Sequence, residues 1–183
     1  MAEEQTKSLN EQLIEAAGKQ DLDLVKELIS RGAEASYVYR QDGTWGAYEQ
    51  YTALHRAITG LNAGESTTDE DRDKWREIIL LLLKNRADPN VTMNKYDWRG
   101  CGSKQSSFEL LGRQGDPHPD ILTAFIDAGL NPNTCRVQDI HSMRTDGMIK
   151  TYLLHDMVSK GSVECAVALL NAGADVEKEV SSS

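Results

Sequence analysis

The chain has 183 residues and a formal net charge of −9, and 39% of its residues are hydrophobic and 27% charged. These values are typical of a folded domain with its own core and exclude a disordered chain. The negative charge argues against a surface for nucleic acid or for an anionic membrane, because phosphate groups would be repelled. We therefore predict no nucleic-acid partner and no membrane partner.

The first residues, MAEEQTKSLNEQL, contain no basic segment followed by an apolar stretch, so no signal peptide is expected. The most apolar run, IILLLL at 78–83, is too short to cross a bilayer and indicates one buried helix face. Cys101, Cys135 and Cys165 lie far apart without a Cys-x-x-Cys pair, which favours free thiols over disulfides or a zinc site. We expect a protein of the cytoplasm or nucleus that has no metal and no cofactor.

The chain then opens with a pair of helical segments. Ser8 and Glu11 have the spacing of a capping box for the first helix. In the second helix Leu22, Val25 and Leu28 fall on one side and form an apolar stripe. One helix pair cannot bury such a stripe alone, so a neighbouring pair must cover it.

This arrangement recurs along the chain. In each copy an apolar helical stretch ends at Gly or a substitute, and a small residue and a polar residue follow. The four copies lie at 24–36, 78–91, 121–134 and 165–178. Gly32, Gly129 and Gly173 stand where the end of a helix favours a left-handed residue, and Arg86 takes that place in the second copy. A shorter helical segment precedes each copy; the second of these is TALHRAITG, which begins at Thr52.

The TALHRA segment and the recurring GAD or ADPN endings resemble the ankyrin repeat, and the resemblance covers about 9–176. It implies an all-α solenoid, an ankyrin-like stack of helix pairs with projecting β-hairpin fingers. We predict one ankyrin-repeat domain over 1–183. Its repeats lie at about 9–52, 52–106, 106–151 and 152–176, with a frayed tail at 177–183. An acidic loop insertion is expected at 62–74, and its Thr68 or Asp69 is expected to cap the helix that follows.

Three connecting segments, which we call the fingers, are longer than those of the family: 33–52, 87–106 and 130–152. Asp42-Gly43 and Asp146-Gly147 predict two-residue hairpin turns, and 99–102 predicts a looser, Gly-rich bend. Residues that favour strands flank these turns. We expect three β-hairpins, stacked in parallel, that project from the helical body.

The fingers are rich in Tyr, Trp, Met and Arg, the residue types enriched at binding hot spots. In the resembled family the fingers and the first helices line a concave groove that holds partner proteins. We therefore predict a non-catalytic adaptor, scaffold or inhibitor, monomeric when free, that binds one or more proteins or peptides through the concave finger face. Strand alternation also predicts that about half of the aromatic side chains pack hairpin on hairpin instead.

The predicted partner-binding residues are Tyr37, Tyr39, Arg40, Trp45, Tyr48, Tyr96, Trp98, Arg99, His141, Met143 and Arg144. Within this set, Trp45, Tyr48, Trp98 and Arg99 are the expected anchors.

Two histidines invite a catalytic interpretation. The resemblance instead implies that His55 and His155 begin the first helix of their repeats and bond local backbone; Glu109 holds the same place in the third copy. The alternative is a small-molecule enzyme or ligand-binding protein, with a pocket between the aromatic fingers and the first helices. The sequence has no glycine-rich phosphate loop, nucleophile elbow or metal-ligand spacing, which disfavours the enzyme.

Overall fold

The computed structural model describes residues 7–63, 68–96, 102–112, 118–142 and 145–178 of the chain. The side chains of 61–63, 102–103, 111–112 and 136–150 are not described. The chain divides into two compact units, Met1–Arg113 and Gln114–Ser183.

The first unit contains α1 (Leu9–Gly18), α2 (Leu22–Ser30), β1 (Tyr39–Asp42), a short 3-10 helix (Thr44–Gly46), β2 (Tyr48–Tyr51), α3 (Ala53–Ala63), α4 (Asp69–Lys84), β3 (Thr92–Tyr96), β4 (Gly102–Ser106) and α5 (Ser107–Gly112). The second contains α6 (Pro119–Asp127), β5 (Cys135–Ser142), β6 (Thr145–Tyr152), α7 (Leu153–Ser159) and α8 (Val163–Asn171).

The expectation of an all-α solenoid is wrong. The structure is mixed α/β: the described residues form eight α-helices, an antiparallel four-stranded sheet in the order β1-β2-β3-β4, and a two-stranded sheet β5-β6. The three expected hairpins form as β1–β2, β3–β4 and β5–β6. The first two join into one sheet because β2 pairs directly with β3, with Tyr48 opposite Tyr96. Adjacent hairpin edges thereby satisfy each other's backbone groups, so the fingers form a sheet layer of their own.

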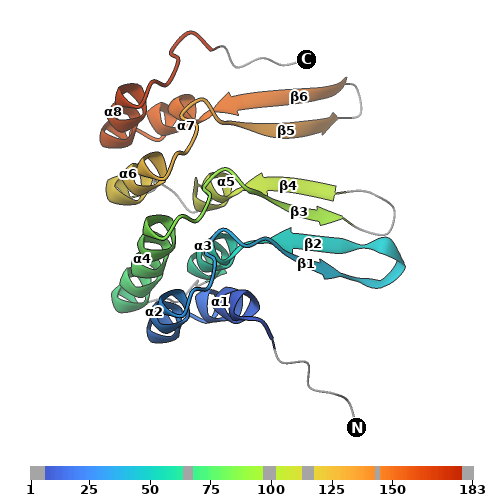
Figure 1. Cartoon of the computed structure of the whole chain (residues 1–183). Coiled ribbons are helices and arrows are strands. Elements are labelled where there is room, and N and C mark those ends of the chain that lie inside the picture. Colours follow the sequence, from blue (N-terminus) through green and yellow to red (C-terminus); the bar gives the residue numbers. More distant parts are fainter. Residues whose placement is uncertain (1–6, 64–67, 97–101, 113–117, 143–144, 179–183) are drawn as a thin grey trace. The chain divides into compact units, whose positions relative to one another are not determined.

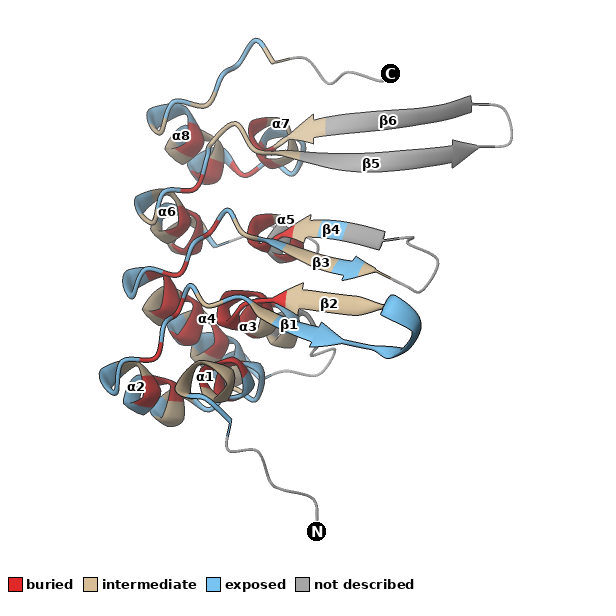
Figure 2. Cartoon of the chain, turned by 45° about the vertical axis from the view of Figure 1, so that its right-hand side comes forward, coloured by how far each residue is buried: buried red, intermediate tan, exposed pale blue. Residues whose placement is uncertain are grey.

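In the first unit, α1, α3 and α5 form a row beside the hairpins, and α2 and α4 lie on the far side of that row (Figure 1). Helix α3 packs against α1, α4 and α5, and buried residues concentrate where these helices face one another (Figure 2). The fully buried residues include Leu13, Leu28, Leu54, Ile58, Ile78, Ile79 and Leu82. A Cβ atom on Gly60 would lie 2.2 Å from the Trp75 ring, so only glycine allows α3 and α4 to approach this closely.

The predicted helix ends are confirmed. Ser8 and Glu11 form a capping box on α1, and Thr68 forms one with Asp71 on α4. The predicted loop at 62–74 is too long, because α3 extends to Ala63 and the capped helix α4 already begins at Asp69. Gly32, Gly129 and Gly173 all have positive φ angles, between 91° and 93°. Arg86 takes the same left-handed conformation, with φ 67°, which costs a non-glycine residue about 1 kcal/mol.

Two of the predicted turns are wrong. Asp42 pairs with Tyr48, so the first hairpin turns over five residues, 43–47, and not at Asp42-Gly43. In this loop Gly43 N donates to Ala47 O at 2.8 Å, and the positive φ angles fall on Trp45 and Gly46.

The second wrong turn is Asp146-Gly147. Both residues lie in β6, opposite His141 and Ile140; β5 ends at Ser142 and β6 begins at Thr145. Of the bend at 99–102, only Gly102 lies within the described residues, and it pairs with Tyr96.

In the second unit, α8 packs against α6 and α7, and the hairpin β5–β6 leads directly into α7. The side chain of Asn133 connects two segments: its Nδ2 donates to Gly173 O at 3.3 Å, and its Oδ1 accepts from Asp175 N at 2.8 Å. Buried residues of this unit include Ile121, Leu122, Phe125, Met157, Cys165 and Leu169. Among the helices described in either unit, none combines the length and apolar character needed to span a membrane.

Candidate functional site

The two faces of the four-stranded sheet carry different aromatic clusters. Residues paired directly across neighbouring strands project to the same face, so Tyr48 and Tyr96 share one face. Their rings stack with centroids 5.0 Å apart and an interplanar angle of 26°. The Arg40 guanidinium lies 4.1 Å from the centroid of the Tyr48 ring, so this face holds an arginine on a stacked tyrosine pair.

The opposite face carries the second cluster. Tyr39 pairs with Tyr51 across β1 and β2, and their ring centroids are 5.5 Å apart. Tyr51 is 6% exposed, and its hydroxyl donates to Gln41 Oε1 at 3.2 Å. The guanidinium of Arg56, from α3, lies 4.0 Å from the centroid of the Tyr51 ring. Helix and hairpin are thus joined by a cation–π contact.

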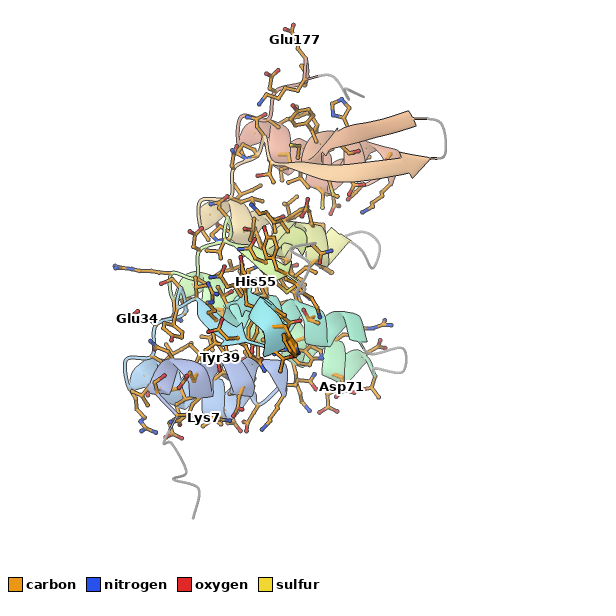
Figure 3. The ribbon with its side chains drawn as sticks, turned by 90° about the vertical axis from the view of Figure 1, so that its right-hand side faces the viewer. Lys7, Glu34, Tyr39, His55, Asp71 and Glu177 are labelled. Carbon is orange, nitrogen blue, oxygen red and sulfur yellow. The ribbon has the colours of Figure 1, made fainter. Side chains whose placement is uncertain are left out.

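A groove of about 1030 Å³ lies beside this second cluster. It is lined by Lys7, Ser8, Glu11, Ile14, Glu15, Gly18 and Lys19 at α1, by Tyr39, Gln41 and Tyr51 of the hairpin, and by Arg56, Thr59 and Gly60 of α3. Lys7 and Tyr39, which are labelled in Figure 3, come from two different walls. β1 is an outer strand of the described sheet, and its residues Tyr39 and Gln41 belong to one of these walls.

The acidic side chains of the groove are already engaged. Glu15 pairs with Lys7, and this hydrogen bond raises the pKa of Lys7 and lowers the pKa of Glu15. Glu11 accepts the backbone N–H of Ser8 at 2.8 Å in the α1 capping box. Arg56, in contrast, forms no ion pair with any residue that the structure describes. Among the described residues, the partner of this guanidinium is therefore the face of the Tyr51 ring.

The structure brings together three of the eleven predicted binding residues, Arg40, Tyr48 and Tyr96. Tyr39 lies on the other face of the sheet, and Tyr37 is half-buried ahead of β1. Trp45 stands in the hairpin loop and is 87% exposed. The remaining predictions lie outside the described residues (Trp98, Arg99, Met143, Arg144) or have an undescribed side chain (His141, in β5).

The groove depends on residues outside the predicted binding set. Tyr51 is a finger aromatic left out of the predicted site, and Arg56 directly follows the histidine of TALHRA. A Cβ atom on Gly18 would lie 3.6 Å from Arg56 Cβ, so α1 passes close to the arginine stem at this glycine. The sequence signal for this contact was a pair of residues: Gly18 in the last turn of α1 and Arg56 on α3.

His55, which is labelled in Figure 3, is fully buried at the start of α3, and both of its ring nitrogens make hydrogen bonds. Its Nδ1 accepts from the backbone N–H of Thr52 at 3.3 Å and from the Thr52 hydroxyl at 2.8 Å. Nε2 therefore carries the proton and lies 3.3 Å from Ser107 Oγ. Burial lowers the pKa of His55 to about 4, against hydrogen bonds with the backbone of Val91 and Gln105 that raise it.

Neither His55 nor His155 lines the groove. Among the residues that the structure describes, no three His, Cys, Asp or Glu side chains gather in a group that could hold a metal ion. No protein-family model matches the chain, and no curated protein matches it. The resemblance to ankyrin repeats therefore stays a prediction that depends on the repeated motifs alone.

Proposed function

We propose that the first unit is a non-catalytic binding module that holds an extended segment of a partner protein in the groove between α1, β1–β2 and α3. The observation that carries the proposal is the composition of the groove walls, in a groove of about 1030 Å³: two tyrosine rings and an arginine that forms no ion pair with a described residue. Tyr and Arg are enriched at protein-binding hot spots. A tyrosine ring gives a large contact area with few torsions to freeze, and a guanidinium supplies several hydrogen-bond donors in a planar fork.

Two further features favour an extended peptide as the occupant. The groove borders β1, an outer strand that can pair with an added strand. Its volume reaches the upper end of the range usual for small-molecule pockets, about 300–1,000 Å³, so a small ligand would leave much of it unfilled. The small-molecule enzyme is less well supported, since neither candidate acid–base histidine contributes to the groove walls.

The test is a selection of displayed random peptides on the purified full-length chain, followed by affinity measurements with three variants. Tyr39→Ala removes one aromatic wall and is expected to weaken the selected peptides by about tenfold or more. Tyr96→Ala removes an aromatic ring from the opposite face of the same sheet and serves as the matched control. Trp45→Ala tests the exposed loop residue that the sequence analysis favoured as an anchor.

The proposal expects a loss for Tyr39→Ala alone, with circular dichroism unchanged in all three variants. A selection that yields no peptide contradicts it, and so does a peptide that binds Tyr39→Ala as well as the unmodified chain. A loss confined to Tyr96→Ala would move the binding surface to the Arg40–Tyr48–Tyr96 face.

A further inference from the structure

The groove contains a cation that is held in position before any ligand arrives. The Tyr51 ring lies under the Arg56 guanidinium, and Tyr51 itself is fixed by its hydroxyl bond to Gln41. On the other side, the aliphatic stem of Arg56 lies against α1 at Gly18, where a Cβ atom would be 3.6 Å from Arg56 Cβ and 3.8 Å from its Cδ. An arginine held in this way loses little side-chain entropy on binding.

The charge of Arg56 is available to a ligand. The two carboxylates of the groove, Glu11 and Glu15, are engaged by Ser8 and Lys7, and no described residue forms an ion pair with Arg56. The guanidinium carbon lies 4.0 Å from the centroid of the Tyr51 ring, and the N–H groups of Arg56 donate to no residue that the structure describes. A guanidinium edge matches the two oxygens of a carboxylate, which it binds through two parallel hydrogen bonds.

The charge of the whole chain limits what this cation can select. The net charge is −9, so a highly anionic ligand is repelled at long range, and the attraction of Arg56 acts only at contact. A partner segment with a single carboxylate satisfies both conditions. The neighbouring Tyr39 and Ile14 side chains line the same groove and suit an apolar or aromatic residue beside it.

We propose that the groove recognises an extended peptide segment that carries one acidic side chain, whose carboxylate binds the guanidinium of Arg56, next to an apolar residue. This inference rests on the proposed function and names the chemistry of its partner.

The experiment is a double-mutant cycle on a peptide from the selection described above. The peptide and its Glu→Gln or Asp→Asn analogue are titrated against the unmodified chain and against Arg56→Gln, at one ionic strength. Each single change is expected to weaken binding about tenfold or more, as for a lost hydrogen bond to a charged group, and the two together should cost no more than either alone. Arg56→Lys keeps the charge but loses the planar fork. Its affinity for the peptide should lie between the affinities of the unmodified chain and of Arg56→Gln.

The control is Lys26→Gln, which removes one positive charge from α2, where Lys26 pairs with Glu77 outside the groove. Lys26→Gln should leave the affinity unchanged. Two results would overturn the inference and leave the proposed function standing. One is a set of selected peptides with no preferred acidic position; the other is additive losses of affinity in the double-mutant cycle. Stronger competition by inorganic phosphate than by chloride at equal ionic strength would also overturn it, since it would indicate a phosphoryl site. A selection without any peptide removes both proposals.

Discussion

Helices α3 and α7 begin with related sequences, Thr-Ala-Leu-His at 52–55 and Tyr-Leu-Leu-His at 152–155, yet their histidines lie in different environments. His55 is fully buried, and its Nδ1 accepts two hydrogen bonds from Thr52. His155 is half-buried, and its buried Nδ1 has no hydrogen-bond partner among the described residues. The predicted bond to local backbone is therefore confirmed for His55 and wrong for His155.

The difference lies in the residue three positions ahead of the histidine. The Thr52 hydroxyl oxygen accepts from His55 N at 3.4 Å, while the Thr52 N–H donates to the histidine ring. This is the reciprocal pattern of a capping box, with His in the place usually held by Glu. Tyr152 precedes α7 without a side-chain cap, and its ring lies 6.3 Å from the His155 ring.

Helix α5 supports this interpretation. Ser106 N donates to Glu109 Oε2 at 2.8 Å, and Glu109 N donates to Ser106 Oγ at 3.2 Å. The requirement at these helix starts is thus a hydroxyl at the cap and an acceptor three residues later. His55 meets this requirement because Thr52 supplies the hydroxyl. His155 does not, because Tyr152 holds the place of the threonine.

The largest expected effect comes from removing the two histidines in turn. His55→Ala should lower the free energy of unfolding by about 4 kcal/mol, because it leaves a cavity and an unsatisfied Thr52 N–H. His155→Ala should cost less than about 1 kcal/mol, since it breaks no hydrogen bond at Nδ1. Urea denaturation followed by circular dichroism measures both. Equal losses would show that the hydrogen bonds of His55 contribute nothing beyond packing.

Local features of this kind could be predicted from the sequence because a few adjacent residues determine them. The capping box of Ser8 with Glu11 and the cap at Thr68 depend on spacings of three residues. The left-handed conformation of Arg86 followed from its alignment with Gly32 in another copy.

Features that join distant segments could not be predicted in this way. The pairing of β2 with β3 depends on the edge of one hairpin meeting the next, and nothing in either finger alone specifies it. The face on which each tyrosine lies depends on register, and the five-residue loop after Asp42 fixes a register that a two-residue turn would not. The groove also needs Arg56 to lie against Gly18 of α1, a contact that only the packing of α1 on α3 produces.

The burial of His55 should also make the free energy of unfolding depend on pH. Because the pKa of His55 is about 4 in the folded chain and its ordinary value is 6.5, the unfolded chain takes up a proton first as the pH falls. The contribution of His55 to stability is therefore fully present above about pH 6.5 and decreases as the pH falls toward 4. Between pH 7 and pH 5 the loss should be about 2 kcal/mol.

Other groups titrate in the same range, so the measurement is a difference between two chains. The free energy of unfolding is determined at pH 7 and pH 5 for the unmodified chain and for His55→Gln, whose side chain can accept the Thr52 N–H without titrating. The decrease should be about 2 kcal/mol smaller in His55→Gln. Identical decreases would mean that His55 does not titrate with a lowered pKa.

The smallest expected effect isolates the threonine that distinguishes α3 from α7. Thr52→Val keeps the shape of the side chain and removes the hydroxyl, so His55 Nδ1 retains only the backbone donor. We expect a loss of about 1 kcal/mol in the free energy of unfolding, measured by urea denaturation. In a His55→Ala background the same change should cost much less, because most of what the hydroxyl stabilises is the ring. If its cost is the same in both backgrounds, the hydroxyl acts only as a cap for the α3 backbone. The different state of His155 would then need a cause other than the tyrosine that precedes it.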